Sequence, residues 1–339
     1  MAISSEVLKV AKVANVVLTY WTVSILMVFF NKHLVGGKGT SADQPDVSIF
    51  IAWVQCLFSV LFIFFYSNVG AFLSDSVKVC RVQYSLLLAK PVVIVSFLFS
   101  FMLSSNNYCL KLVGVAFFQI ARSFTLIFTV IFSVTLLNMR ASYMVILSCI
   151  IVVLGFLIGV DQEQAAGTLS VLGVISGLVS SLFVSLNGIY TKKAMKIDEM
   201  DSVKLMLHVN INSVVILFIP VVFSGQMAGV VEVGKLTESK FWFATCASGV
   251  LGFLIGWAST RQIDYTSPIT HHVSNNTKSI LQSLLAVWVY EDYKSALWWL
   301  GCFTVLLGAF MYTYVRIKED GRKEKVIEVT NMPARSIHV

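Results

Sequence analysis

Two basic residues, Arg122 and Lys278, lie inside otherwise apolar stretches of the sequence. If these stretches cross a membrane, each cation costs at least about 2.5–3.5 kcal/mol to insert. No Asp or Glu occurs within the ten apolar segments given below, so pairing of these cations with buried acids is the less favoured interpretation. Two fixed cations that face one cavity would instead bind a doubly charged anion.

Two related classes of phosphate compound carry the required charge. A nucleoside monophosphate and a diphosphate that joins two esters each bear about two negative charges near pH 7. Exchange of one for the other would leave the charge of the cavity almost unchanged. The two cations therefore predict a site for phosphate groups.

Polar side chains gather around Lys278 more densely than elsewhere in the apolar segments. The run that contains Lys278 carries His271, Ser274, Asn275, Asn276 and Thr277. Further polar candidates on other segments are Tyr20, Asn187 and Asn210. Such amides and hydroxyls suit the edges of bases, ribose and sugar hydroxyls. Hydrogen bonding between helices is the alternative that stays open for most of them.

Metal and catalytic chemistry receive no support from the sequence. His271-His272 has no third ligand of a suitable type, and the six cysteines are scattered singly without a CxxC spacing. The sequence also has no Gly-rich phosphate loop, no nucleophile–base constellation and no paired carboxylates. We expect no metal, no cofactor and no enzymatic activity.

The composition indicates that lipid is the natural solvent of most of the chain. Apolar residues make up 57% of the 339 residues, above the roughly 45–50% of globular proteins, and charged residues make up only 13%. A spanning helix takes about 20 mostly apolar residues. The sequence predicts an all-α membrane protein with ten transmembrane helices, at 12–35, 47–70, 90–112, 114–137, 142–160, 170–192, 203–224, 240–261, 267–290 and 296–316.

The positions of the two cations suggest an internal repeat. Arg122 lies in the fourth predicted helix and Lys278 in the ninth, so each belongs to the fourth helix of a five-helix half. Because five is odd, the halves would insert with opposite orientation, as in many secondary transporters with a midplane site. The predicted organisation is a cytosolic N-terminus at 1–12, five-helix repeats at 13–160 and 161–316, and a disordered cytosolic tail at 317–339.

The loop charges predict the orientation. The chain has 25 Lys and Arg against 18 Asp and Glu. With the N-terminus in the cytosol, basic residues of the cytosolic loops and tails outnumber those on the other side by roughly three to one, as the positive-inside rule requires. Both termini are therefore expected in the cytosol. The excess of positive charge reflects topology, and no nucleic-acid partner is expected.

Several strings in order along the chain carry a family resemblance. They are Tyr20-Trp21, Met27–Lys32, Asn106–Phe117, Arg122-Ser123, Gly159–Glu163, Gly167–Ser170, Ser185–Thr191 and Thr266–His271. With these residues the chain resembles the nucleotide-sugar transporters of the drug/metabolite transporter superfamily, and among them the GDP-fucose transporters of the Golgi. The likeness extends over nearly the whole chain except its two tails.

The resemblance implies roles for particular residues. The basic residue of the family's fourth helix falls on Arg122, and the substrate-contacting tyrosine of the first helix falls on Tyr20. The family's Gly-Ala-Leu-Asn-Lys motif falls on Ser274–Lys278, where only the lysine matches. Its Phe-Tyr-Asn-Asn motif, associated with guanine, falls near Leu207–Asn210, where one asparagine matches.

The function implied by the resemblance is antiport across the Golgi membrane. A ten-helix carrier of this family would import GDP-fucose into the lumen and export GMP by alternating access. Membrane lipid is the expected surrounding, and a homodimer and an additional location in the endoplasmic reticulum are compatible with it. The alternatives are a carrier of another nucleotide sugar or a sugar phosphate, a drug exporter of the same superfamily, or a multi-spanning transferase enzyme.

Overall fold

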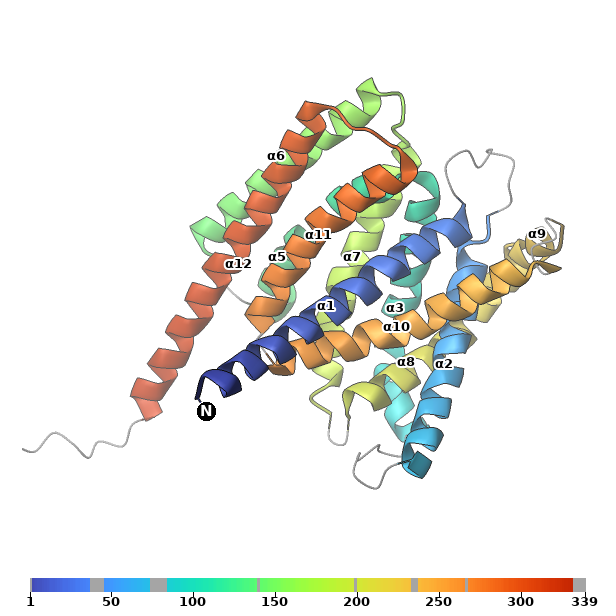
Figure 1. Cartoon of the computed structure of the whole chain (residues 1–339), viewed down its shortest axis with the longest axis horizontal. Helices are drawn as coiled ribbons and strands as arrows, with labels where there is room; N and C mark the ends of the chain where they lie inside the picture. The colour runs from blue at the N-terminus through green and yellow to red at the C-terminus, as the bar shows by residue number, and fades with distance from the viewer. Residues whose placement is uncertain are drawn as a thin grey trace, which may run out of the picture.

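The computed structural model describes residues 2–36, 46–73, 84–138, 141–197, 200–232, 237–265 and 268–331. Over these ranges the fold is built from helices and has no strand (Figure 1). The helices are α1 (Ala2–Val35), α2 (Ser48–Leu73), α3 (Leu86–Leu112), α4 (Val115–Arg122), α5 (Phe124–Leu137), α6 (Tyr143–Ala165), α7 (Val171–Ala194), α8 (Ser202–Phe223), α9 (Gln226–Glu232), α10 (Ser239–Tyr265), α11 (Pro268–Tyr290) and α12 (Ala296–Asn331).

Most of the predicted spans correspond to helices of membrane length. In the described ranges, nine helical stretches are long and apolar enough to cross a membrane, with α4 and α5 together forming one of them. The predicted span at 267–290 is helix α11, which has 23 residues but is not among the nine. Its length suffices, because 23 residues extend about 34 Å. Its first half is too polar, because it carries Lys278 and the polar residues around it.

The fourth predicted span is divided beside Arg122. Helix α4 ends at Arg122, and α5 begins at Phe124. Ser123 lies between them and turns back onto α4, since its backbone N–H and its Oγ both donate to the Ile120 carbonyl, at 3.1 and 2.6 Å. A single helix was expected at 114–137. Because of the break, Arg122 is the last residue of the short helix α4.

Two other helices extend past their predicted ends. Helix α6 continues to Ala165, five residues beyond the predicted span at 142–160, and stops before Gly167, whose φ of +69° favours glycine. The Ser142 hydroxyl caps its first turn by accepting from the Val145 N–H at 3.4 Å. Helix α12 continues to Asn331, into the tail expected to be disordered, and residues 332–339 lie outside the described ranges.

Helices α6 and α12 share the most extensive contact among the described helices and lie side by side at one edge of the molecule (Figure 1). Glycines allow this approach. A Cβ added at Gly155 would lie 2.7 Å from the Gly301 carbonyl oxygen, and one added at Gly301 would lie 2.9 Å from the Gly155 carbonyl oxygen. Such close backbone contact through small residues is typical of helix association in membranes.

The other helices pack as pairs that are distant in sequence. Helix α1 lies against α10, α3 against α7 and α8, α2 against α8 and α10, and α4 against α11. Gly249 of α10 allows close approach to α2, since an added Cβ would lie 2.6 Å from the Phe58 Cβ.

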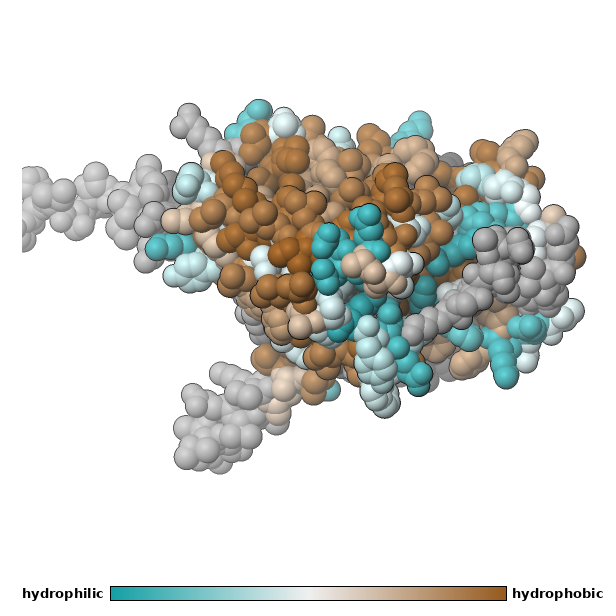
Figure 2. All heavy atoms as spheres, turned by 90° about the horizontal axis from the view of Figure 1, so that it is seen from above, coloured by the Kyte–Doolittle hydropathy of each residue, from teal (hydrophilic) through white to brown (hydrophobic). Residues whose placement is uncertain are grey.

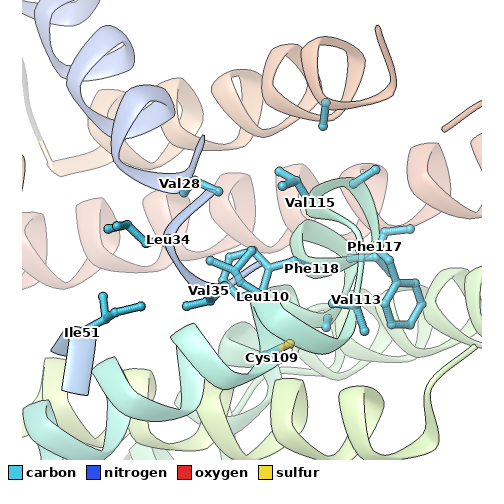
Figure 3. Packing of buried hydrophobic residues seen from close by; sticks show 14 of the residues in the cluster. Val28, Leu34, Val35, Ile51, Cys109, Leu110, Val113, Val115, Phe117 and Phe118 are labelled. Atoms are coloured by element: carbon cyan, nitrogen blue, oxygen red, sulfur yellow. The ribbon is translucent and has the colours of Figure 1, made fainter. Parts of the chain in front are cut away.

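The outer surface is largely apolar, as a lipid-facing surface must be. Large hydrophobic side chains such as Phe65, Ile94, Leu157 and Phe303 are exposed. Figure 2 shows broad apolar areas, with hydrophilic atoms gathered in the centre and to the right of that face. The main buried cluster lies where α1, α3 and α4 meet, and includes Val28, Leu110 and Phe118 (Figure 3).

We call the side of the bundle that holds the end of α1 the closed end. It is formed by the last turns of α1, α3, α6 and α11, which surround a common cavity described below. The N-terminus and the described end of α12 lie together at the opposite end (Figure 1).

Candidate anion-binding site

Lys278 of α11 is buried, with 5% of its surface exposed. Its Nζ donates a hydrogen bond to the Ser24 hydroxyl of α1 and lies 5.5 Å from the centre of the Tyr20 ring. Ser24 and Tyr20 are four residues apart, so both lie on the same face of α1. The ring face and the hydroxyl stabilise a positive charge without neutralising it.

Two further hydrogen bonds join the polar run of α11 to α1. The Tyr20 hydroxyl donates to Asn275 Oδ1 at 3.1 Å, and the Trp21 indole N–H donates to Ser274 Oγ at 2.8 Å. Together with the bond from Lys278 to Ser24, they align about one turn of α11 with about one turn of α1. The polar residues of α11 are thus held by α1.

Arg122 stands at the end of α4, which packs against α11. Its guanidinium lies 5.7 Å from the centre of the Phe118 ring, one turn back on the same helix. Arg122 and Lys278 are close enough for appreciable electrostatic repulsion, and the Tyr20 side chain is within electrostatic range of Arg122. The two cations of the sequence analysis therefore share one region of the protein.

Among the described side chains, neither cation has a carboxylate within ion-pair distance. The ion pairs recorded between described residues are Lys111–Asp46, Lys294–Glu163, Lys294–Asp292 and Arg316–Glu319. Among the described residues, half-buried Arg122 and buried Lys278 thus carry positive charges that no carboxylate neutralises. This arrangement can bind a dianion, because a charge in a low-dielectric setting interacts far more strongly than in water.

The remaining predicted ligands differ in their surroundings. Asn276 is half-buried and Thr277 is exposed. The side-chain oxygen of Asn187 on α7 is buried and lacks a hydrogen-bond partner among the described residues. Asn210 on α8 donates to the Met206 carbonyl of its own helix at 2.7 Å, and the structure records no contact between it and the two cations. The side chain of His271 lies outside the described residues.

A cavity of about 240 Å³ lies at the closed end. Its lining includes Lys32 of α1, Lys111 of α3, Glu163 of α6, and Tyr290 and Asp292 at the end of α11. Lys32 lies within the predicted span at 12–35, and the structure buries it near the end of α1. Its Nζ donates to the carbonyls of Leu110 and Val113, at 2.6 and 2.9 Å, and so ties the end of α1 to the end of α3.

An ionic network centred on Glu163 borders this cavity. The Glu163 carboxylate pairs with Lys294 at 2.6 Å, accepts from the Trp298 indole N–H at 2.9 Å and accepts from the Thr168 hydroxyl. Lys294 also pairs with Asp292 at 3.1 Å. Glu163, Asp292 and Lys294 lie outside the predicted spans at 142–160, 267–290 and 296–316, so no such network was expected. A signal was available, because Glu163 lies within the Gly159–Glu163 string of the family.

Comparison with known proteins agrees with this architecture. The sequence profile of the Triose-phosphate Transporter family matches residues 11–313. The chain belongs to this family. Proteins named GDP-fucose transporter 1 are similar to it: one from Nematostella vectensis is 37% identical over 314 residues, with 92% of this chain and 91% of that protein covered. One from Mus musculus is 38% identical, with 91% and 84% covered.

A GDP-fucose transporter from Caenorhabditis elegans is also 38% identical, with 92% of this chain and 84% of that protein covered. A solved crystal structure of 14% identity matches with a TM-score of 0.51, covering 92% of this chain and 98% of that one, and it supports the fold alone. This member of the triose-phosphate transporter family is therefore a multi-pass membrane transporter and not an enzyme.

Proposed function

We propose that this transporter imports GDP-fucose into the Golgi lumen in exchange for GMP. The names of the similar proteins from Nematostella vectensis, Mus musculus and Caenorhabditis elegans support the substrate. The observation that carries the chemistry is the pair Arg122 and Lys278, which have no carboxylate partner among the described residues. GDP-fucose and GMP each bring about two negative charges to such a site.

The packing of the helices supports two inverted repeats, with boundaries at 13–160 and 161–316. We count α4 and α5 together as the fourth span and α11 as the ninth, and we pair each span of the first half with the span five positions later. When each span is replaced by its counterpart, the α3–α7 contact becomes the α10–α1 contact, which is also observed. The same exchange converts α3–α8 into α10–α2, and it maps the pairs α2–α8, α4–α11 and α6–α12 onto themselves. Arg122 and Lys278 then occupy equivalent spans at the interface between the halves, where carriers of this kind bind their substrates.

Alternating access would open the two ends of the bundle in turn. The closed end, with Lys32 bonded to the end of α3 and Glu163 paired with Lys294, would be the lumenal side of the cytosol-accessible state. The distribution of basic loop residues supports this orientation, with both termini in the cytosol.

Electrostatics would couple the two substrates. In the empty carrier Arg122 and Lys278 repel one another in an apolar setting, so the empty site should change sides slowly. An anion that bridges both cations removes the repulsion and connects α4 to α11. Exchange of one phosphate compound for another then requires no separate ion gradient.

Uptake by reconstituted vesicles tests this function. Vesicles preloaded with GMP should take up GDP-fucose much faster than empty vesicles, and collapse of a proton gradient should have little effect. Guanosine, which has no phosphate, should fail as the counter-substrate. Equal exchange with guanosine would contradict the role of the phosphates, even if GDP-fucose is transported.

A carrier for a different nucleotide sugar is the second candidate. Asn210, the one match to the guanine-associated motif, donates to its own helix rather than toward the two cations. A panel of nucleotide sugars with different bases and sugars in the same vesicles separates the two candidates. Preferred uptake of a UDP sugar would replace GDP-fucose in the proposal and leave the anion site intact.

A further inference from the structure

One row of side chains on α11 connects the two-cation site to the cavity at the closed end. Lys278, Gln282, Ala286 and Tyr290 follow at intervals of four and therefore share one face of the helix. Lys278 donates to Ser24 at one end of this row, and Ala286 and Tyr290 line the cavity at the other. Gln282 thus lies on the same face between the site and the cavity.

The amide of Gln282 is buried without a partner. The residue is fully buried, and neither Nε2 nor Oε1 has a hydrogen-bond partner among the described residues. A buried polar atom that lacks a hydrogen bond costs free energy, so such atoms are uncommon in folded proteins and call for an explanation. Here a donor and an acceptor of one side chain are both unused.

A second amide repeats the pattern on the facing helix. Gln119 of α4 stands three residues before Arg122, and its Nε2 is buried without a partner among the described residues. Helices α4 and α11 are in contact. Each cation of the site therefore has, about one turn away on its own helix, an amide with unused hydrogen-bonding capacity.

The chemistry of an amide restricts what can satisfy Gln282. Ionised phosphate oxygens only accept hydrogen bonds, so they can engage Nε2 but not Oε1. A hydroxyl both donates and accepts and can engage both atoms. Gln282 is about 6 Å along the helix from Lys278. A hexose attached to a phosphate on Lys278 would carry its hydroxyls within such a distance, whereas the base is separated from that phosphate by the ribose.

We infer that Gln282 binds the hydroxyls of the transported sugar and so selects nucleotide sugars over nucleotides. This inference rests on the proposed function, because it requires a nucleotide sugar whose phosphates are held by Lys278 and Arg122. The amide remains without partners while the site is empty, and the hexose supplies them on binding. Only the substrate that carries a sugar then offsets the free-energy cost of burying the Gln282 amide.

The variant Gln282→Met tests this inference, because methionine has a similar length and does not form amide hydrogen bonds. Two assays are run in the same vesicles: uptake of GDP-fucose against internal GMP, and self-exchange of GMP, which carries no hexose. We expect the KM for GDP-fucose to rise about tenfold, while GMP self-exchange changes less than twofold. The thermal midpoint of the empty protein should stay the same or rise, since two unsatisfied atoms are removed.

A matched control is Gln226→Met. Gln226 is also buried, but its Oε1 accepts from the N–H groups of Ile49 and Phe50, both at 2.9 Å. Loss of these bonds should lower the thermal midpoint and affect both transport assays in proportion. If Gln282→Met behaves like this control, or lowers both assays equally, Gln282 is a structural residue and the inference is wrong.

Deoxy substrates provide an independent test. A GDP-hexose lacking the hydroxyl that Gln282 contacts should have the same KM with the parent protein and with Gln282→Met. If the ratio of the KM of Gln282→Met to that of the parent protein is the same for every member of a complete set of monodeoxy sugars, the inference is wrong. Failure of the parent protein to exchange any nucleotide sugar would instead reject the proposed function, and the two outcomes are distinguished in the same experiment.

Discussion

The ammonium of Lys278 on α11 donates to the hydroxyl of Ser24 on α1, so the ninth predicted span is joined to the first at the position of the buried charge. In the proposed repeats these two helices belong to different halves of the protein. A charge placed on such a contact is sensitive to both halves. Under the proposed function, a substrate that binds at Lys278 would therefore act on both halves.

Removal of either cation should nearly abolish transport. Lys278→Ala and Arg122→Ala each remove one of two charges that a dianion requires, and we expect uptake of GDP-fucose to fall to near background in vesicles. Arg122→Lys should also lose most activity, because an ammonium cannot reproduce the bidentate geometry of a guanidinium on phosphate. Lys192→Ala, at an exposed position of α7, is the control and should retain activity. Normal uptake by both alanine variants would reject the anion site.

Tyr20→Phe should weaken substrate binding moderately. The change removes the hydrogen bond to Asn275 but keeps the ring beside Lys278. A neutral hydrogen bond contributes about 0.5–1.5 kcal/mol, so we expect a KM increase of up to about tenfold with little change in protein yield. Tyr20→Ala, which also removes the ring, should be clearly worse. Equal KM values for the two variants would show that the ring does not contribute.

Glu163→Gln should destabilise the closed end. The substitution leaves Lys294 buried with only Asp292 as an acidic partner and weakens the bond from the Trp298 indole. Loss of one partner of a buried ion pair costs about 3–5 kcal/mol. We expect a lower thermal midpoint in detergent and greater accessibility of Lys111 and Asp292 positions to labelling reagents after substitution with cysteine. Unchanged stability would mean that water already satisfies this network.

Gly155→Leu should prevent α6 and α12 from packing. An added Cβ alone would lie 2.7 Å from the Gly301 carbonyl, which is backbone and cannot rotate away. We expect a large loss of folded protein in a fluorescence size-exclusion assay. Gly188→Ala is the matched control, because an added Cβ there meets nothing within 4 Å. Folding of the Gly155 variant at the level of this control would contradict the observed approach of the two helices.

The spans were predictable because apolar runs of about 20 residues have few alternatives in a membrane. What the sequence did not reveal depends on contacts between distant segments. Glu163 extends α6 past residue 160 because Trp298 and Lys294 satisfy its carboxylate, and these partners are more than a hundred residues away. Likewise, nothing near Lys32 in the sequence indicates that two carbonyl groups at the end of α3 accept hydrogen bonds from its ammonium group.

Part of the candidate site was also predictable from the apolar segments. Charged and polar residues inside apolar segments are few, so Tyr20, Ser274, Asn275 and Lys278 were singled out, and the structure brings them together. The indole of Trp21 gave no signal of its own beyond the family string, because an aromatic residue in a membrane helix usually packs against apolar neighbours. Asn210 was also a candidate, and its amide turns to a carbonyl of its own helix.

Helix α1 contacts both the two-cation site and the end of α3 through one continuous segment. Ser24 meets Lys278, and Lys32, two turns further along, holds the carbonyls at the end of α3. These two α1 residues are separated by about 12 Å of unbroken helix. Because the helix is continuous, a tilt of α1 that moves Ser24 at the two-cation site also moves Lys32 relative to α3. Under the proposed function, a substrate bound at Lys278 would therefore act through α1 on the contact between Lys32 and α3.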